Sequence, residues 1–218
     1  MARPIAVLRP EPGNRVTASA IEARGRTAIR LPLFEARPLV WQAPDPSGFD
    51  ALIVTSANTL RHGGAGLDRL IALPFYAVGE ATAEAAKRMG FHVAGMGKAG
   101  SVQLLEIAEA AGVGRALHLA GRERSIEAGG IVAQVIAVYA SDAVADVDPA
   151  RLAGSVALVQ SARAGARLAE LVADRGNMAI VAISARAAEA VGKGWERVVV
   201  PDGVAGETMI DTAIALAD

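Results

Sequence analysis

The sequence predicts an α/β protein made of two related, doubly wound parallel-sheet domains of the flavodoxin-like kind, joined by a two-stranded connector. Three observations lead to this expectation. Short apolar runs alternate with helical segments, and the two halves of the chain repeat one another. In addition, the N-terminal segment matches the end of the middle block rather than its beginning. A chain of 218 residues, of which 52% are hydrophobic, is long enough to bury two small cores.

The predicted strands are short, continuous apolar runs, which are typical of parallel strands buried on both faces. They are residues 5–8, 51–54, 76–79, 116–120, 156–159, 179–183 and 197–200. Between them lie stretches in which apolar residues recur at helical spacing. These predicted helices are residues 16–24, 81–89, 101–110, 163–173, 186–191 and 206–216. Strands that alternate with helices indicate an α/β fold with helices on both faces of each sheet.

The chain aligns with itself at an offset of about 105 residues. Three blocks share this single register: residues 31–36, 51–57 and 76–86 fall on their counterparts in the second half. The residues paired in this way include Phe34 with Tyr139, Ser56 with Ser161, and Thr82 with Ala187. A period this long indicates a duplicated domain rather than a solenoid of short repeats.

The repeat also predicts the domain boundaries. The middle block ends with a strand, a short helix and a strand that have no counterpart at the C-terminus, but the N-terminus supplies one. We therefore expect a discontinuous first domain of residues 1–33 and 143–218, with a second domain of residues 37–135 inserted into it. Residues 34–36 and 136–142 would be the connector strands. Tyr139, one of only two tyrosines, lies on the return strand, where we expect it to face the gap between the domains.

Composition excludes several classes of function. With 22 basic and 23 acidic residues and no basic block, the chain does not have the positive charge expected of a protein that binds nucleic acid. There is no cysteine, which excludes disulfides and thiolate chemistry. The apolar part of the N-terminus is too short for a signal peptide, and no run approaches the roughly 20 apolar residues of a membrane span. We expect a cytoplasmic monomer that contacts no membrane.

The usual catalytic motifs are also absent. The sequence has neither a phosphate-binding loop nor a dinucleotide fingerprint, and neither a zinc-protease helix nor a nucleophile elbow. The three histidines, His62, His92 and His118, are scattered, and the last two lie on apparent strands, where packing is the more natural role. We therefore expect neither a metal nor a cofactor.

Binding is expected at the carboxyl ends of the predicted strands, where parallel sheets bind ligands and helix N-termini offer free amides. Small, hydroxylated or basic residues gather there. The candidate substrate-binding residues are Arg9, Ser56, Asn58, Gly79, Thr82, Ser101, Arg122, Ser161 and Ser184. Each has a structural alternative, because such residues are common helix caps, and Arg9 is equally compatible with a buried structural role. Together they favour a polyanionic ligand.

Several motifs in this order resemble the uroporphyrinogen-III synthase family. They are LRPEP, FDALIVTSANTL, YAVGEATAEAAKRMG, LHLAGRE, the VY pair, and LVQSARAG, and they span essentially the whole chain. The resemblance implies two α/β domains with an active site between them. It also implies cyclisation of a linear tetrapyrrole, hydroxymethylbilane, to uroporphyrinogen III in heme and porphyrin biosynthesis, with loss of water and inversion of ring D.

The resemblance also implies roles for individual residues. The tyrosine implicated in catalysis matches Tyr139, a turn hydroxyl matches Thr82, and a serine of the other domain matches Ser161. Each could instead be structural: a packed strand residue, a first-turn residue and a helix cap. Phe34, the repeat partner of Tyr139, indicates that packing alone does not require the phenol. Many members of the family carry threonine where this chain has Ala187, and Ser184 or backbone amides could replace that contact.

Two other functions remain open at this point. The first is a cytoplasmic two-domain protein that binds an anion or a tetrapyrrole without turnover. Formation of isomer III would distinguish the enzyme from such a binder. The second is a flavodoxin-like redox module, which would be recognised by flavin absorbance in the purified protein.

Overall fold

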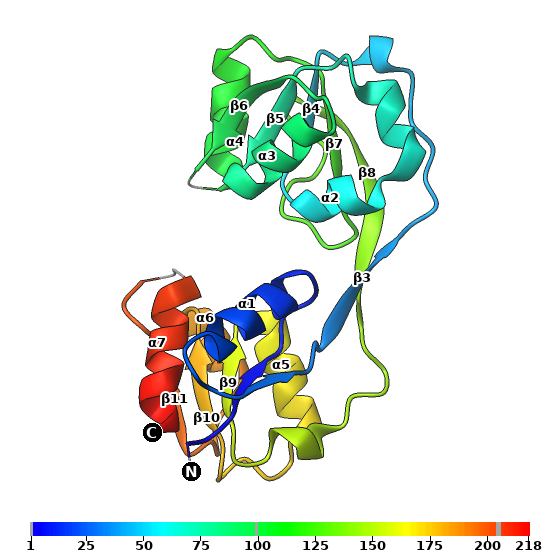
Figure 1. Ribbon diagram of the computed structural model, residues 1–218. Coiled ribbons are helices and arrows are strands. Elements are labelled where there is room, and N and C mark those ends of the chain that lie inside the picture. The colour runs from blue at the N-terminus through cyan, green and yellow to red at the C-terminus, as the bar shows by residue number, and fades with distance from the viewer. Residues whose placement is uncertain (1, 99, 204–205) are drawn as a thin grey trace. The chain divides into compact units, whose positions relative to one another are not determined.

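The computed structural model describes residues 2–98, 100–203 and 206–218 (Figure 1). The chain divides into two compact units. The first contains the residues up to Glu35 together with Asp142–Asp218, and the second contains Ala36–Ser141. The chain passes between the units twice, within β3 (Phe34–Pro38) and within β8 (Val132–Ala143).

The first unit is built on a five-stranded parallel sheet with the order β11-β10-β9-β1-β2. Its strands are β1 (Ile5–Val7), β2 (Ala28–Arg30), β9 (Val156–Val159), β10 (Ala179–Ala182) and β11 (Arg197–Val199). Its helices are α1 (Gly13–Glu22), the 3-10 turn η3 (Pro149–Leu152), α5 (Ala162–Leu171), α6 (Ala185–Ala190) and α7 (Gly206–Ala217). Counted along the chain, this is the 2-1-3-4-5 order of flavodoxin-like folds.

Alternate residues of the central strand β9 face two separate cores in this unit. Val156 and Leu158 pack with buried residues of α1 and α7, whereas Ala157 and Val159 pack with those of α5 and α6. The helices therefore cover both faces of the sheet, as the sequence predicts. Strand β11 is an edge strand, and its Val198 is 37% exposed rather than buried as the apolar run predicts.

The second unit has a six-stranded sheet with the order β3-β8-β7-β4-β5-β6. Its remaining strands are β4 (Ala51–Val54), β5 (Phe75–Val78), β6 (Val93–Gly97) and β7 (Ala116–Gly121). Its helices are η1 (Pro46–Gly48), α2 (Ala57–His62), η2 (Gly64–Leu70), α3 (Glu80–Arg88) and α4 (Ser101–Ala110). Buried residues of α2, η2 and α3 pack on one face of this sheet, and those of α4 pack on the other.

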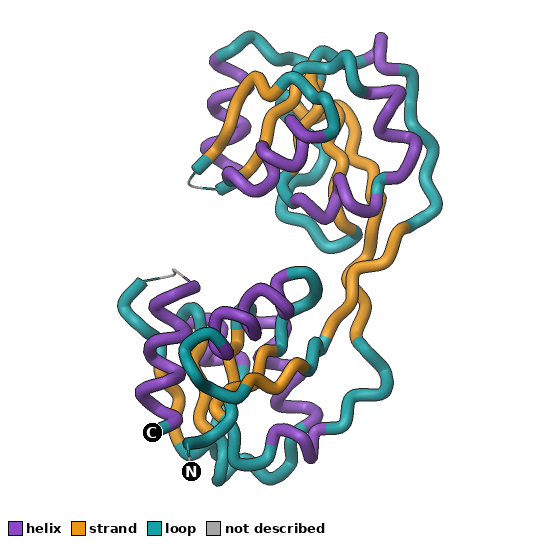
Figure 2. The backbone as a smooth tube through the Cα atoms, viewed as in Figure 1, coloured by secondary structure: helices purple, strands orange, loops and turns teal. Residues whose placement is uncertain are grey.

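The five parallel strands β8-β7-β4-β5-β6 repeat the spatial order of the first unit, with β7 and β8 in the places of β1 and β2. The fold class predicted from the sequence is therefore confirmed. Strand β3 runs antiparallel to β8, since Leu39 N donates to Val138 O and Val144 N donates to Leu33 O. Figure 2 shows these two strands side by side.

One predicted element is not formed. The sequence predicts a short helix between β7 and β8, but residues 122–131 form bends and turns instead. Gly129 and Gly130 have positive φ angles of 145° and 54°, which a helix cannot contain. Arg124 braces the segment, because its guanidinium donates to Arg122 O at 3.0 Å and pairs with Glu127 at 2.8 Å.

His118 lies at the centre of the second unit. It is fully buried on β7, beside Ile53 and Val135 of the neighbouring strands. Within the described residues neither ring nitrogen has a hydrogen-bond partner of normal geometry. Burial lowers the pKa of His118 from 6.5 to about 4, and the Ile126 backbone opposes this only in part. His118 therefore packs in the core, as expected for a histidine on a buried strand. His92, in contrast, is exposed and precedes β6 rather than lying on it.

This burial predicts an acid-sensitive second unit. As the pH falls from 6.5 towards 4, His118 becomes protonated in the unfolded chain but stays neutral in the folded chain. The free energy of unfolding therefore falls over this range. We expect a loss of about 2 kcal/mol between pH 7 and pH 5 that is absent in His118→Leu. Urea unfolding followed by Trp41 fluorescence in a Trp195→Phe background would measure it. The exposed His92→Leu variant should keep the full pH dependence, and an equal dependence in His118→Leu would contradict the prediction.

Candidate active site

In the first unit, three candidate residues lie just beyond the carboxyl ends of neighbouring strands. Arg9 follows β1, Ser161 follows β9 and Ser184 follows β10. Ser161 caps α5, since its Oγ accepts from Ala164 N at 3.1 Å, and Ser184 caps α6 by accepting from Ala187 N at 3.3 Å. A hydroxyl that accepts in this way still has its own proton to donate. Ala187 is fully buried and offers the site no polar group.

A buried asparagine that the sequence did not single out organises the turn that carries Arg9. Asn14 Nδ2 donates to Val7 O at 2.7 Å and to Arg9 O at 3.1 Å, while its Oδ1 accepts from Arg30 Nε at 3.1 Å. Arg30 in turn pairs with Glu11. In the sequence, an asparagine after Pro-Gly is typical of a helix cap, but here its side chain bonds backwards to the preceding loop.

Arg9 itself is exposed, so the structure does not show the buried structural arginine considered as its alternative. Its side chain lies against Gly13, where an added Cβ would come within 2.4 Å of Arg9 Nε. Glycine at position 13 therefore leaves room for the arginine, and the Asn14 turn holds its backbone in place.

In the second unit, the remaining candidates follow four adjacent strands. Ser56 follows β4, Gly79 follows β5, Ser101 follows β6 and Arg122 follows β7. Because these strands are parallel and adjacent, the four residues lie along one edge of the sheet, at its carboxyl end. Gly79 has a φ of 74° as it leads into α3, a conformation that strongly favours glycine.

The other polar candidates of this edge make local contacts. Ser56 Oγ caps α2 by accepting from Asn58 N at 3.2 Å, and Asn58 Oδ1 accepts from Arg61 Nη1 at 2.8 Å. Thr82 is in the first turn of α3 and is only 4% exposed. Ser101 Oγ lies 3.5 Å from Ser125 Oγ, which connects the start of α4 to the segment after β7.

Tyr139 lies at the same edge, on β8 beside the last residue of β7. The β7–β8 register pairs Ala120 with Ala137 but Gly121 with Tyr139, so a bulge precedes the tyrosine. The Tyr139 carbonyl accepts from Arg122 N at 2.8 Å. Its phenol lies over Gly121, because an added Cβ there would be 2.8 Å from Cζ and 3.0 Å from Oη. Its ring centroid is 6.0 Å from that of His62, a neighbour that the sequence did not identify.

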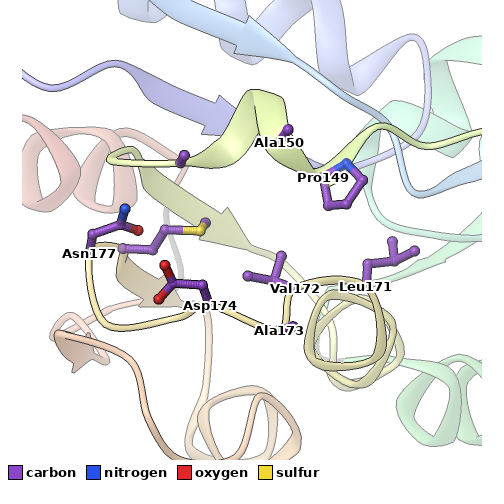
Figure 3. Close-up of a pocket in the computed structure, with 9 residues that line it drawn as sticks. Pro149, Ala150, Leu171, Val172, Ala173, Asp174 and Asn177 are labelled. Atoms are coloured by element: carbon purple, nitrogen blue, oxygen red, sulfur yellow. The ribbon is translucent and has the colours of Figure 1, made fainter.

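The first unit also contains a cavity of about 280 Å³, drawn in Figure 3. Pro149 and Ala150, the end of α5 at Leu171 and the loop residues Asp174 and Asn177 line it. Pro149 and Ala150 begin η3 ahead of β9, and the other three residues end α5 or precede β10, so the cavity lies at the amino-terminal edge of the sheet. It is therefore separate from Ser161 and Ser184, and the strand-end residues remain the better candidate site.

The fold and the site define a class. The chain is an α/β protein with two flavodoxin-like sheets, each with candidate binding residues beyond the carboxyl ends of its strands. Residues 2–98, 100–203 and 206–218 contain no group of three or more His, Cys, Asp or Glu side chains placed to hold a metal ion. Across the same residues, no helix has the length and apolarity needed to cross a membrane.

Known proteins narrow this class to one family. The family model of uroporphyrinogen-III synthase HemD matches residues 15–211. The crystal structure of uroporphyrinogen-III synthetase from Helicobacter pylori 26695 is similar at a TM-score of 0.70 and 19% identity, over 98% of this chain and 99% of that one. A mutant uroporphyrinogen III synthase from Thermus thermophilus is similar at a TM-score of 0.55 and 16% identity, over 99% of each chain. No curated protein sequence matches the chain.

The two solved structures support the fold, and the family match supports the assignment. The chain belongs to the uroporphyrinogen-III synthase family, and its activity is that of a cyclising lyase in heme and porphyrin biosynthesis. This assignment does not favour the alternative of a binding protein without turnover.

Proposed function

We propose that the chain converts hydroxymethylbilane into uroporphyrinogen III, with Tyr139 as the proton donor. The observation that carries this role is the position of the phenol, which lies over Gly121 at the carboxyl end of β7 and is partly exposed. The other tyrosine, Tyr76, is buried on β5 and is only 4% exposed. Tyr139 is therefore the phenol that a substrate at this edge can reach.

The chemistry requires only a weak acid at that point. When the hydroxyl group leaves the ring A hydroxymethyl carbon, the pyrrole stabilises the resulting azafulvenium cation, so a phenol near the leaving oxygen suffices. The substituted carbon of ring D then attacks the cation to form a spiro intermediate, which fragments and recloses with ring D inverted. The pyrroles regain aromaticity with release of one proton, which balances the proton that left with the water.

The protein's larger task is to hold a flexible substrate in the conformation for this attack. Unguided closure of the chain ends gives the symmetrical isomer I, so formation of isomer III depends on orientation. The eight carboxylates of the substrate provide the handles. Capping hydroxyls and helix amides donate hydrogen bonds to carboxylates without a strongly basic surface.

We assign the carboxylate contacts to residues of both strand-end clusters. They are Arg9, Ser161 and Ser184 of the first unit, and Ser56, Asn58, Gly79, Thr82, Ser101 and Arg122 of the second. Thr82 is the least accessible of them. The proposal requires no nucleic acid, membrane or cofactor, and one copy of the chain in the cytoplasm suffices.

The decisive experiment generates hydroxymethylbilane in situ with the preceding enzyme of the pathway, adds this protein, and oxidises the products. Chromatography then resolves uroporphyrin isomers I and III. We expect isomer III to dominate. If the folded protein leaves only isomer I, the enzymatic proposal fails and the binding protein becomes the better description.

A further inference from the structure

The phenol of Tyr139 is placed by the backbone as well as by its neighbours. Ala120 and Gly121 are consecutive on β7, but their partners on β8, Ala137 and Tyr139, are two residues apart. The extra residue on β8 forms a bulge just before the tyrosine. Such a bulge changes the direction of the side chain that follows it, and bulges are common next to active sites. Since Gly121 has no side chain, the Tyr139 ring occupies the space above it.

The second neighbour of the phenol is His62, the last residue of α2. The two ring centroids are 6.0 Å apart and the ring planes are inclined by 31°. Contacts of this kind between flat rings favour particular orientations in addition to burying area. Burial lowers the pKa of His62, and Arg61 lowers it further, so both effects favour the uncharged form of the imidazole beside the phenol.

The segment that carries His62 is anchored on both sides of it. Before it, Thr59 is buried with its Oγ1 3.4 Å from Leu119 O on β7, and Leu60 is buried in the core. Directly after it, Gly63 O accepts from Trp41 Nε1 at 2.8 Å. His62 is therefore presented from a fixed position relative to β7, the strand that also carries Gly121.

We propose that His62 is a positioning residue for Tyr139, with an imidazole that restricts the phenol to the orientation over Gly121. The proposal rests on the role of Tyr139 given above and assigns His62 an effect through the tyrosine rather than a contact with substrate. A partly exposed tyrosine otherwise exchanges among staggered side-chain orientations. A ring contact of this kind changes the occupancy of one orientation by about fivefold.

The test compares His62→Ala and His62→Phe in the wild-type and in the Tyr139→Phe enzyme. We expect His62→Ala to lower kcat for isomer III by about fivefold with little change in KM. His62→Phe, which keeps a flat ring, should recover activity to within about twofold. In the Tyr139→Phe enzyme, His62→Ala should cause no further loss, because the two residues act as one unit. The exposed His92→Ala is the matched control and should be fully active.

Two results would overturn the proposal: an equal loss from His62→Ala with and without the phenol, or no recovery in His62→Phe. NMR of the tyrosine ring provides a readout that does not depend on turnover. Only two tyrosines are present, so Tyr139→Phe assigns the signals. The Tyr139 signal should move towards its unfolded position in His62→Ala but not in His62→Phe. If the wild type forms only isomer I while this pattern holds, the positioning contact stands and the enzymatic proposal fails.

Discussion

Replacing Tyr139 by phenylalanine is expected to lower kcat for isomer III by about 10²-fold, the lower end of what a positioned proton donor contributes. Phenylalanine keeps the ring that lies over Gly121 and beside His62 and removes only Oη. Folding and substrate binding should therefore be retained, with an unchanged KM and an unchanged unfolding temperature. The isomer assay measures kcat and KM, and a thermal melt measures the unfolding temperature.

Tyr76→Phe is the matched control, because it removes the other phenol of the same unit from a buried position on β5. It should leave turnover unchanged. Unchanged turnover in Tyr139→Phe would instead reduce Tyr139 to a packing residue, and the proton would then have to come from solvent or from the substrate itself.

Replacing Asn14 by alanine is expected to destabilise the first unit by about 3 kcal/mol. The change removes the donor for two backbone carbonyls, those of Val7 and Arg9, and the acceptor for Arg30 Nε. The Val7 carbonyl still accepts from Leu31 N, so the expected loss corresponds to three hydrogen bonds at about 1 kcal/mol each rather than to an unpaired carbonyl there. Because the loop that presents Arg9 would loosen, we also expect a higher KM for the substrate.

Urea unfolding of Asn14→Ala in a Trp41→Phe background would follow the first unit alone through Trp195. Asn177→Ala is the matched control, since Asn177 is exposed and its backbone carbonyl rather than its side chain accepts from Arg3. A loss in Asn14→Ala no larger than that in the control would show that the turn does not depend on this side chain.

Much of the fold could be predicted because buried parallel strands leave a simple signal. The apolar run at residues 156–159 becomes β9, and the run at residues 51–54 becomes β4, each followed by a capping serine. The offset of the repeat also pairs these strands correctly, since each lies at the centre of its own sheet. Continuous hydrophobicity and helix caps are local properties, so a single sequence contains them.

The parts that could not be predicted depend on contacts between distant segments. Nothing near His62 indicates that its ring meets Tyr139, because that contact requires both the β7–β8 bulge and the placement of α2. Asn14 looks like a helix cap until its bonds to Val7 and Arg9 are seen. The segment after β7 has the composition of a short helix, but its two glycines with positive φ prevent one.

The order of strands along the chain has a consequence for the origin of the two sheets. If the chain is divided between β6 and β7 and the connector strand β3 is set aside, each part contributes five strands: β1, β2, β4, β5 and β6 from the first, and β7 to β11 from the second. Yet the first unit combines β1 and β2 with β9 to β11, and the second combines β7 and β8 with β4 to β6. This is the arrangement that a reciprocal exchange of strands between two tandem copies of one module would give, with β3 and the end of β8 as the extended hinges. Neither half of the chain contains all the strands of one sheet, so splitting the gene at its midpoint would leave fragments of both sheets on each product.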